Sequence, residues 1–173
     1  MRPDIERHVQ ESLAPLRVSW SFMLAACLAW AALGLFASPV ISPSNSPTAK
    51  PWTTVIIAFG VLSAVATILI DRAIITPKRM AALITVPDLA LVQRHLLAGH
   101  LVLWSFAQLP ALFGFAQLLL DGSLGAHLAL CAVSLAILAL LMPTRTRIAT
   151  RMEAVLVAPP AQTTRKARRK GRK

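Results

Sequence analysis

The side chains in this sequence that are best suited to chemistry are a few polar groups inside a long apolar segment. Gln108 is followed by Pro110, Ser105 precedes it by about one helical turn, and Gln117 lies farther along. An amide in this setting would bind a substrate or, as is more common, donate to a neighbouring membrane helix, and we prefer the second interpretation. Pro110 removes a backbone N–H, so the helix is expected to kink there and to leave a carbonyl that needs a partner away from lipid.

His127 completes this candidate polar intramembrane site. It lies about one turn into the last apolar segment, where an imidazole titrates near neutral pH or ligates a metal. A lone histidine near the membrane boundary is the preferred interpretation. Haem held by two histidines is disfavoured, because His95 and His100 are expected on the opposite side of the membrane from His127.

The strongest indication about function is an absence of charge. No Asp, Glu, Lys or Arg lies at the centre of any long apolar segment, where proton relays and ion-coupled transporters place such groups. Glycine-rich phosphate loops, GxSxG, HExxH and CxxC are missing, and Cys27 and Cys131 lie inside apolar runs as small buried hydrophobes would. Asp71 is interpreted as one half of a boundary pair with Arg72 or Lys78. We therefore expect no catalysis, no cofactor and no metal.

The composition indicates a membrane protein. Hydrophobic residues make up 56% of the 173-residue chain and charged residues 14%, whereas soluble domains carry roughly 25% charge. A helix needs about 20 apolar residues to cross a bilayer. Four segments without Asp, Glu, Lys or Arg come close to that length: 18–37, 53–70, 101–120 and 124–142. We predict an all-α polytopic membrane protein, a four-helix bundle of two antiparallel hairpins, with a tight turn at 121–123. The first segment is too long for a signal-peptide core, with cleavage near residue 38 as the alternative.

Positive charge is sorted between the ends of these segments. Residues 1–17 carry three Lys or Arg, residues 71–100 carry four and residues 143–173 carry ten, whereas the other two connections hold only Lys50. Lys and Arg accumulate on the cytoplasmic side of membrane proteins. Both termini are therefore predicted to be cytoplasmic, in a bacterial inner membrane.

The segments that flank the apolar runs have patterns of their own. Within residues 1–17, apolar side chains recur at helical spacing between Ile5 and Leu16, so we expect an amphipathic helix on the cytoplasmic leaflet, with a frayed leader as the alternative. The third membrane helix should begin near Pro87, well before residue 101, and project into the cytoplasm. Three tryptophans near helix ends are expected at the headgroup level, where the indole N–H stays wet: Trp20, Trp52 and Trp104.

Residues 143–173 are predicted to form a basic cytoplasmic tail. It ends in seven positive charges: Arg165, Lys166, Arg168, Arg169, Lys170, Arg172 and Lys173. Such a run repels itself and is typical of disorder. Anionic lipid headgroups are its preferred partner, at about 1 kcal/mol per basic residue near the surface. A topology signal alone is the second interpretation, and nucleic acid the last, because no aromatic residue is interleaved for base stacking.

One helix has a local resemblance to a known family. Residues 107–120, Ala-Gln-Leu-Pro-Ala-Leu-Phe-Gly-Phe-Ala-Gln-Leu-Leu-Leu, resemble the outer helix of the ATP synthase proteolipid, subunit c. Gln108 stands where that family has its proton-carrying carboxylate, and an amide cannot titrate, so rotor activity is not implied. The overall plan is also similar to small bacterial four-helix inner-membrane proteins, which implies a location.

These observations favour a non-catalytic integral membrane protein, an accessory, scaffolding or assembly component of a membrane complex. Small residues on the second and third helices allow close packing within the chain, against a second copy or against another membrane protein. A small transporter or channel with a polar site at Gln108 and Pro110 is the alternative. A membrane enzyme that uses Asp88, His95 or His100 comes third.

Overall fold

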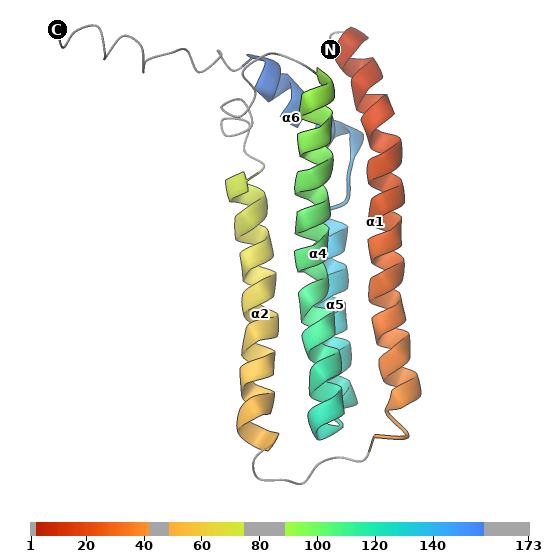
Figure 1. Ribbon diagram of the computed structural model, residues 1–173, viewed down its shortest axis with the longest axis vertical. Helices are drawn as coiled ribbons and strands as arrows, with labels where there is room; N and C mark the ends of the chain where they lie inside the picture. Colours follow the sequence, from red (N-terminus) through yellow and green to blue (C-terminus); the bar gives the residue numbers. More distant parts are fainter. Residues whose placement is uncertain (1–2, 42–48, 75–88, 158–173) are drawn as a thin grey trace, which may run out of the picture.

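The computed structural model describes residues 3–41, 49–74 and 89–157, which are mostly helical (Figure 1). Five helices are present in these ranges: α1 (Pro3–Ala37), α2 (Ala49–Ile74), α4 (Leu89–Asp121), α5 (Leu124–Leu140) and α6 (Arg145–Val157). No strand occurs in the part of the chain that the structure describes. The predicted all-α fold is therefore confirmed.

Among the described residues, three helices are long and apolar enough to cross a membrane, and the bent pair of α5 and α6 is a fourth candidate. The 17 residues of α5 extend about 26 Å at ~1.5 Å per residue, slightly less than the ~30 Å hydrocarbon core. Large apolar side chains are exposed on the helix surfaces, for example Val18 (71%), Phe22 (72%) and Phe36 (81%). An apolar surface of this extent fits a multi-pass membrane protein whose outer surface faces lipid.

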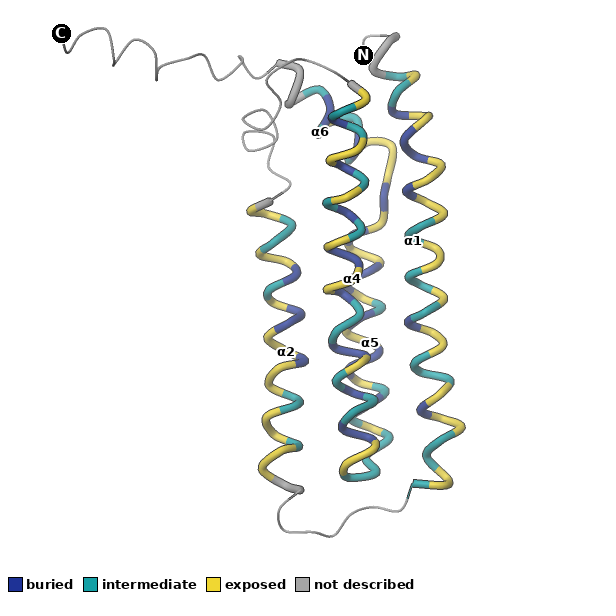
Figure 2. The backbone as a smooth tube through the Cα atoms, in the orientation of Figure 1, coloured by how far each residue is buried: buried dark blue, intermediate teal, exposed yellow. Residues whose placement is uncertain are grey.

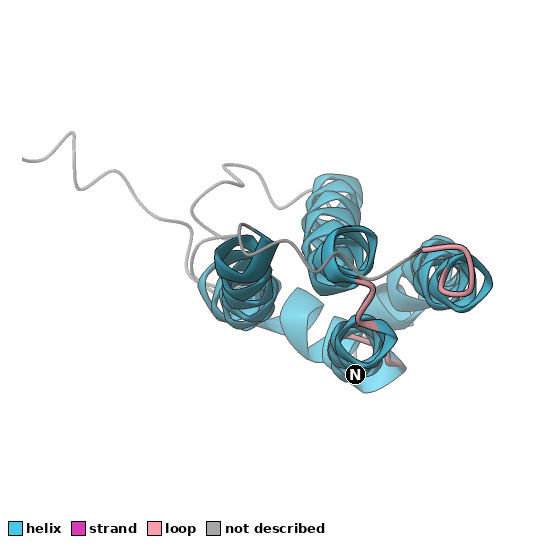
Figure 3. Ribbon diagram, turned by 90° about the horizontal axis from the view of Figure 1, so that it is seen from below, coloured by secondary structure: helices cyan, strands magenta, loops and turns pink. Residues whose placement is uncertain are grey.

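The central helix of the bundle is α4, which packs against α1, α2 and α5 (Figures 1 and 3). Helices α1 and α2 follow one another in sequence but lie on opposite sides of α4, and they are not among the substantial helix pairs of the described residues. Helices α4 and α5 form an antiparallel hairpin, and α2 and α4 also pack directly against each other in opposite directions. The predicted pairing of the first two helices is replaced by their separate packing on α4.

The turn between α4 and α5 has the predicted form. Asp121 ends α4, Leu124 begins α5, and Gly122 between them adopts a positive φ of 73°, a conformation that costs glycine little. The Asp121 carboxylate accepts from the backbone N–H of Ser123 at 2.9 Å and from the Thr53 hydroxyl of α2 at 3.2 Å. One carboxylate thus fixes the turn and joins it to α2.

Residues of the predicted amphipathic segment are helical but do not form a separate surface helix. They are the first part of α1, which continues through Pro15 without a break. The apolar face of this part is buried against protein, in one core cluster with residues of α4 and α6 (Figure 2). That cluster includes Val9, Leu13 and Leu16 of α1, Val92 and Leu96 of α4, and Ile148 and Met152 of α6. The apolar face of this part of α1 therefore packs on α4 and α6, whereas the sequence had predicted that it would lie on the membrane surface.

The long helix predicted to follow the second connection is present as α4, and the kink expected at Pro110 stays a prediction. Helix α4 has 33 residues, or about 50 Å at ~1.5 Å per residue, and is one continuous helix through Pro110. Its predicted start at Pro87 lies outside the described residues. The hydroxyl of Ser134 on α5 accepts from the backbone N–H of Ala111, next to the proline, at 3.0 Å. A neighbouring helix thus supplies a polar partner where the proline disturbs the backbone ladder.

Candidate functional site

Polar contacts from several helices meet at the break between α5 and α6. Pro143 cannot continue α5, because it has no N–H and its ring clashes with the preceding turn. Thr144 caps the start of α6, since its hydroxyl accepts from the backbone N–H of Arg147 at 3.3 Å and its carbonyl accepts from that of Ile148 at 3.1 Å. The two helices meet at 57°. A helix that ends against other helices leaves carbonyls that need partners.

Side chains from three other helices satisfy these carbonyls. Trp20 of α1 and Trp104 of α4 donate from their indole N–H groups, and Arg147 of α6 donates from Nη1. The acceptors are the carbonyls of Leu138, Leu141 and Leu140, at 2.9, 3.3 and 2.6 Å respectively. The carbonyl of Ile137 accepts from the backbone N–H of Leu141 at 2.9 Å, and the carbonyl of Ala139 accepts from that of Met142 at 3.2 Å. Every carbonyl from residue 137 to 141 therefore has a donor.

This arrangement corrects the prediction for two of the tryptophans. Trp104 is fully buried and Trp20 is partly buried, and each indole N–H donates to protein. Neither N–H therefore has the wet headgroup setting that was expected of it. Trp52 is 64% exposed. For Trp52 the headgroup position stays a prediction.

An acidic residue at the end of α2 holds α6 in place. The carboxylate of Asp71 accepts from Arg147 Nη2 and from Arg151 Nη2, each at 2.7 Å. The side chains are mostly enclosed, with 15% of Asp71, 29% of Arg147 and 12% of Arg151 exposed. Among the described residues, Asp71 thus has two ion pairs with α6 in place of the expected pair with Arg72, whereas a pair with Lys78 stays a prediction. Arg72 is exposed and Lys78 lies outside the described residues.

His100 of α4 extends this ionic cluster. Its Nδ1 donates to the Leu96 carbonyl at 2.7 Å, and its Nε2 accepts from Arg151 Nη1 at 3.0 Å, which requires the neutral imidazole with the proton on Nδ1. Burial lowers the pKa of the Arg151 guanidinium, and its hydrogen bond to Asp71 acts in the opposite direction. Arginine stays charged throughout the working pH range. We call Asp71, His100, Arg147 and Arg151 the α6 clamp.

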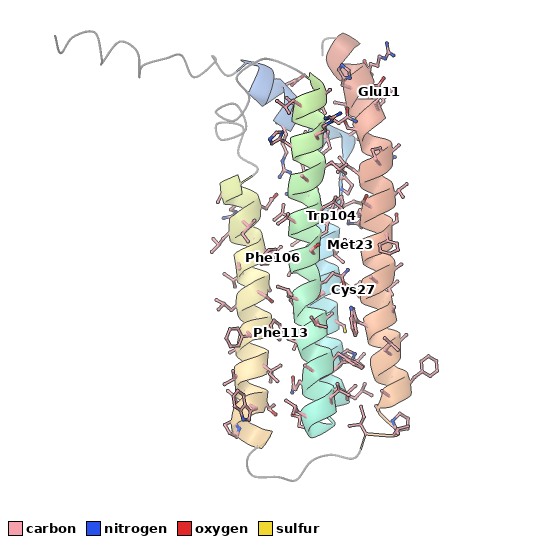
Figure 4. The ribbon with its side chains drawn as sticks, in the orientation of Figure 1. Glu11, Met23, Cys27, Trp104, Phe106 and Phe113 are labelled. Carbon is pink, nitrogen blue, oxygen red and sulfur yellow. The ribbon has the colours of Figure 1, made fainter. Side chains whose placement is uncertain are left out.

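A second polar region lies deeper, between α1 and the α4–α5 hairpin. Gln108 donates from Nε2 to the Met23 carbonyl of α1, while its Oε1 is buried without a partner. The Cys27 thiol points to the Cys131 carbonyl at 3.9 Å. Met23 and Cys27 lie on the side of α1 that faces α4 and α5 (Figure 4). The amide therefore makes an interhelical contact, the role that was weighed against substrate binding.

His127 is buried against α1, while its expected position near the membrane boundary stays a prediction. Its Nε2 lies 3.1 Å from the Trp30 carbonyl of α1, and its ring meets Phe115 at a centroid distance of 5.9 Å. Gly34 leaves the space for this ring, because a Cβ there would overlap Nε2 and Cδ2 of the imidazole. Cys131 lies with its sulfur 3.7 Å from Nε2. His127 thus fills a notch in α1.

The neighbour of His127 was missed by sequence reasoning. Cys131 follows His127 by four residues, a spacing that places both on one face of a helix. This signal was available in the sequence. No group of three or more His, Cys, Asp or Glu side chains suited to a metal exists among the described residues. The pair takes part in the packing between α1 and α5, where His127 meets the Trp30 carbonyl and the Cys131 carbonyl meets the Cys27 thiol.

The four predicted polar site residues do not converge. Ser105 is exposed and donates to the Leu101 carbonyl of its own helix at 2.9 Å. Gln117 is buried near the opposite end of the bundle from α6, where Nε2 donates to Asp121 at 3.3 Å and Oε1 has no partner. Within the described ranges, no hydrogen bond joins any two of Ser105, Gln108, Gln117 and His127. Each serves a different contact.

The remaining candidate residues have separate positions. His95 is exposed and its Nδ1 lies 2.9 Å from the Leu91 carbonyl. Asp88 and the basic residues 165–173 lie outside the described part of the chain. Helix α6 itself was missed, because residues 143–173 were taken as one basic tail. Its signals in the sequence were the helix start at Pro143-Thr144 and the apolar pair Ile148 and Met152 at a spacing of four. The side chains of Ile148 and Met152 are both fully buried.

Comparison with protein-family models, with curated proteins and with solved structures finds no significant match to this chain.

Proposed function

We propose that α1, α2, α4 and α5 are four membrane spans and that both termini lie in the cytoplasm of a bacterial cell. The described ends of the chain, at Pro3 and Val157, lie at the same end of the bundle (Figure 1). Of the 18 Lys and Arg residues, 17 belong to residues 1–17, 71–100 and 143–173, which the positive-inside rule assigns to the cytoplasmic side. Helix α6 then lies at the cytoplasmic surface rather than continuing α5 through the bilayer.

We further propose that the chain is a non-catalytic scaffold or assembly component that acts by contact with another membrane protein. The observation that carries this proposal is the complete set of donors to the carbonyls of residues 137–141. A helix break in a transporter exposes carbonyls that coordinate an ion or substrate. Here Trp20, Trp104 and Arg147 already donate to them. The break therefore serves to position α6.

A small transporter or channel is the second candidate function. It is favoured by the two buried amide oxygens without partners, Oε1 of Gln108 and Oε1 of Gln117. An unpaired polar atom in a low-dielectric interior is costly and is a reason to look for a ligand. The two amides bond different partners, Gln108 to α1 and Gln117 to Asp121. A single polar path would have to connect both.

The partners that we propose are therefore another membrane protein, or a second copy of this chain, together with anionic lipid headgroups. The basic residues 165–173 would attract anionic lipid once α6 has placed the start of the tail at the membrane surface. A role of the tail in topology alone is the alternative. Nucleic acid is the weakest partner, because the run contains no aromatic residue.

Affinity purification of the full-length chain in mild detergent, followed by quantitative mass spectrometry, tests the scaffold proposal. We expect one other membrane protein at near-stoichiometric amount with the wild-type chain. Asp71→Asn should reduce its recovery severalfold, because α6 is then released, while Glu11→Gln on exposed α1 surface should leave it unchanged. A homogeneous homodimer without a second protein would contradict contact with another membrane protein, would leave a second copy of the chain as the partner, and would favour the transporter.

A further inference from the structure

A cleft lies between α1 and the start of α6. It has a volume of about 300 Å³, at the lower end of the roughly 300–1,000 Å³ of ligand pockets. Its walls are formed by Val9, Gln10, Leu13, Ala14, Arg17 and Arg145. One wall is thus largely apolar, and two guanidinium groups from different helices contribute the charge. No carboxylate is among the lining residues.

The cleft lies where the exposed apolar surface of the bundle ends. Arg17 directly precedes Val18 and is followed within two turns by Phe22, both more than two-thirds exposed. At the junction of α5 and α6, Leu140 is 70% exposed and Arg145 follows five residues later. Exposed apolar surface corresponds to the hydrocarbon region, and arginines at its limit correspond to the headgroup level. In the membrane orientation proposed above, both arginines would stand at the depth of lipid phosphates.

We propose that this cleft binds the phosphate of an acidic glycerophospholipid, with Arg17 and Arg145 as its two cationic ligands. Arginine presents planar N–H donors that match phosphate oxygens. The wall formed by Val9, Leu13 and Ala14 suits the glycerol and upper acyl carbons of the same lipid. The ligand chemistry is that of a phosphate with adjoining apolar chains. The proposal rests on the membrane orientation given under Proposed function.

The neighbouring charges leave Arg145 and Arg17 available. Arg145 pairs with Glu6 of α1, and its side chain remains 55% exposed. A guanidinium has five N–H donors, so one ion pair does not exhaust it. Glu11 is occupied by Arg7 and His8 on α1 itself. Arg147 and Arg151 are directed to Asp71 in the α6 clamp. The cleft lining contains no carboxylate that could pair with Arg17. A lipid phosphate would therefore supply the counter-charge for Arg17.

Native mass spectrometry of the full-length protein in uncharged detergent tests this site. Phosphatidylglycerol is titrated against phosphatidylcholine with the same acyl chains, and inorganic phosphate is added alone in a third series. We expect preferential binding of one phosphatidylglycerol, weakened about fivefold by Arg17→Gln and by Arg145→Gln, as one basic residue at the headgroup level would be worth. Arg94→Gln is the matched control, because it removes one exposed charge from α4. It should leave this binding unchanged.

The proposal is overturned if Arg17→Gln and Arg94→Gln weaken phosphatidylglycerol binding equally. It is also overturned if phosphatidylcholine binds the wild-type protein with the same affinity as phosphatidylglycerol. Displacement of the lipid by inorganic phosphate at equal concentration would show a free-anion site and would also overturn it. Arg17 is exposed, so its variant should keep the wild-type unfolding temperature even if Arg145→Gln does not. If the lipid preference is absent while both termini are cytoplasmic, only this site is refuted. If the termini lie on the other side of the membrane, the membrane orientation itself is refuted.

Discussion

Asp71→Asn should release α6 from the bundle while leaving the spans folded. The substitution keeps the shape of the side chain but leaves the guanidinium groups of Arg147 and Arg151 without their counter-charge. Breaking a buried ion pair from one side costs about 3–5 kcal/mol, and partial exposure of this cluster reduces the expected loss to about 2–3 kcal/mol. Hydrogen exchange should show it directly, with the backbone amides of residues 145–157 exchanging faster than in the wild type.

Glu11→Gln is the control for the loss of a single carboxylate. Glu11 pairs with Arg7 on the exposed surface of α1, and such pairs contribute little. Exchange in α6 should therefore stay at the wild-type rate in this variant. If Asp71→Asn also left α6 as protected as in the wild type, the α6 clamp would not be what holds this helix, and buried Ile148 and Met152 alone would account for its position.

Gly34→Leu should separate α1 from α5 near the end of the bundle opposite α6. Even a Cβ at this position would overlap the imidazole of His127, which is enclosed by Trp30, Phe115 and Cys131. Overpacking of a dense interior typically costs 1–3 kcal/mol, and a full leucine side chain here should cost about 3 kcal/mol. Thermal unfolding in detergent, followed by circular dichroism, measures the loss.

Gly125→Leu provides the matched control, because no atom lies within 4 Å of a Cβ built there. The same substitution should therefore be close to neutral at that position. Adding His127→Ala to Gly34→Leu should restore part of the stability, since the smaller side chain leaves room for the leucine. Equal loss from the two glycine variants, or no recovery in the double variant, would show that the notch in α1 is not a specific fit.

The fold was largely predictable because membrane helices are coded by local composition. The apolar segments 53–70 and 101–120 lie inside α2 and α4, and the turn at Asp121 and Gly122 follows from residue type. The separation of α1 from α2 could not be predicted, since consecutive membrane helices are equally free to pack together or on a third helix. Which helix lies at the centre depends on side-chain fit along the whole length of α4.

The polar contacts were less predictable, because they join residues far apart in sequence. Asp71 and Arg151 are separated by 80 positions, and the partner of Gln108 is a backbone carbonyl of α1. A local pattern contains no information about such partners. Helix α6 is different, because the Pro143-Thr144 start and its apolar pair are local signals. They were outweighed by the high positive charge of the segment that contains them.

Both proposals depend on the orientation of the bundle, so reporter fusions test the account most directly. A reporter enzyme that is active only in the periplasm should be silent when fused after Lys173 and active when fused after residue 45, beyond the first span. A reporter active only in the cytoplasm should give the reverse at both positions. Strong periplasmic activity after Lys173 would place α6, the α6 clamp and the basic residues outside the cell membrane, and would contradict the account.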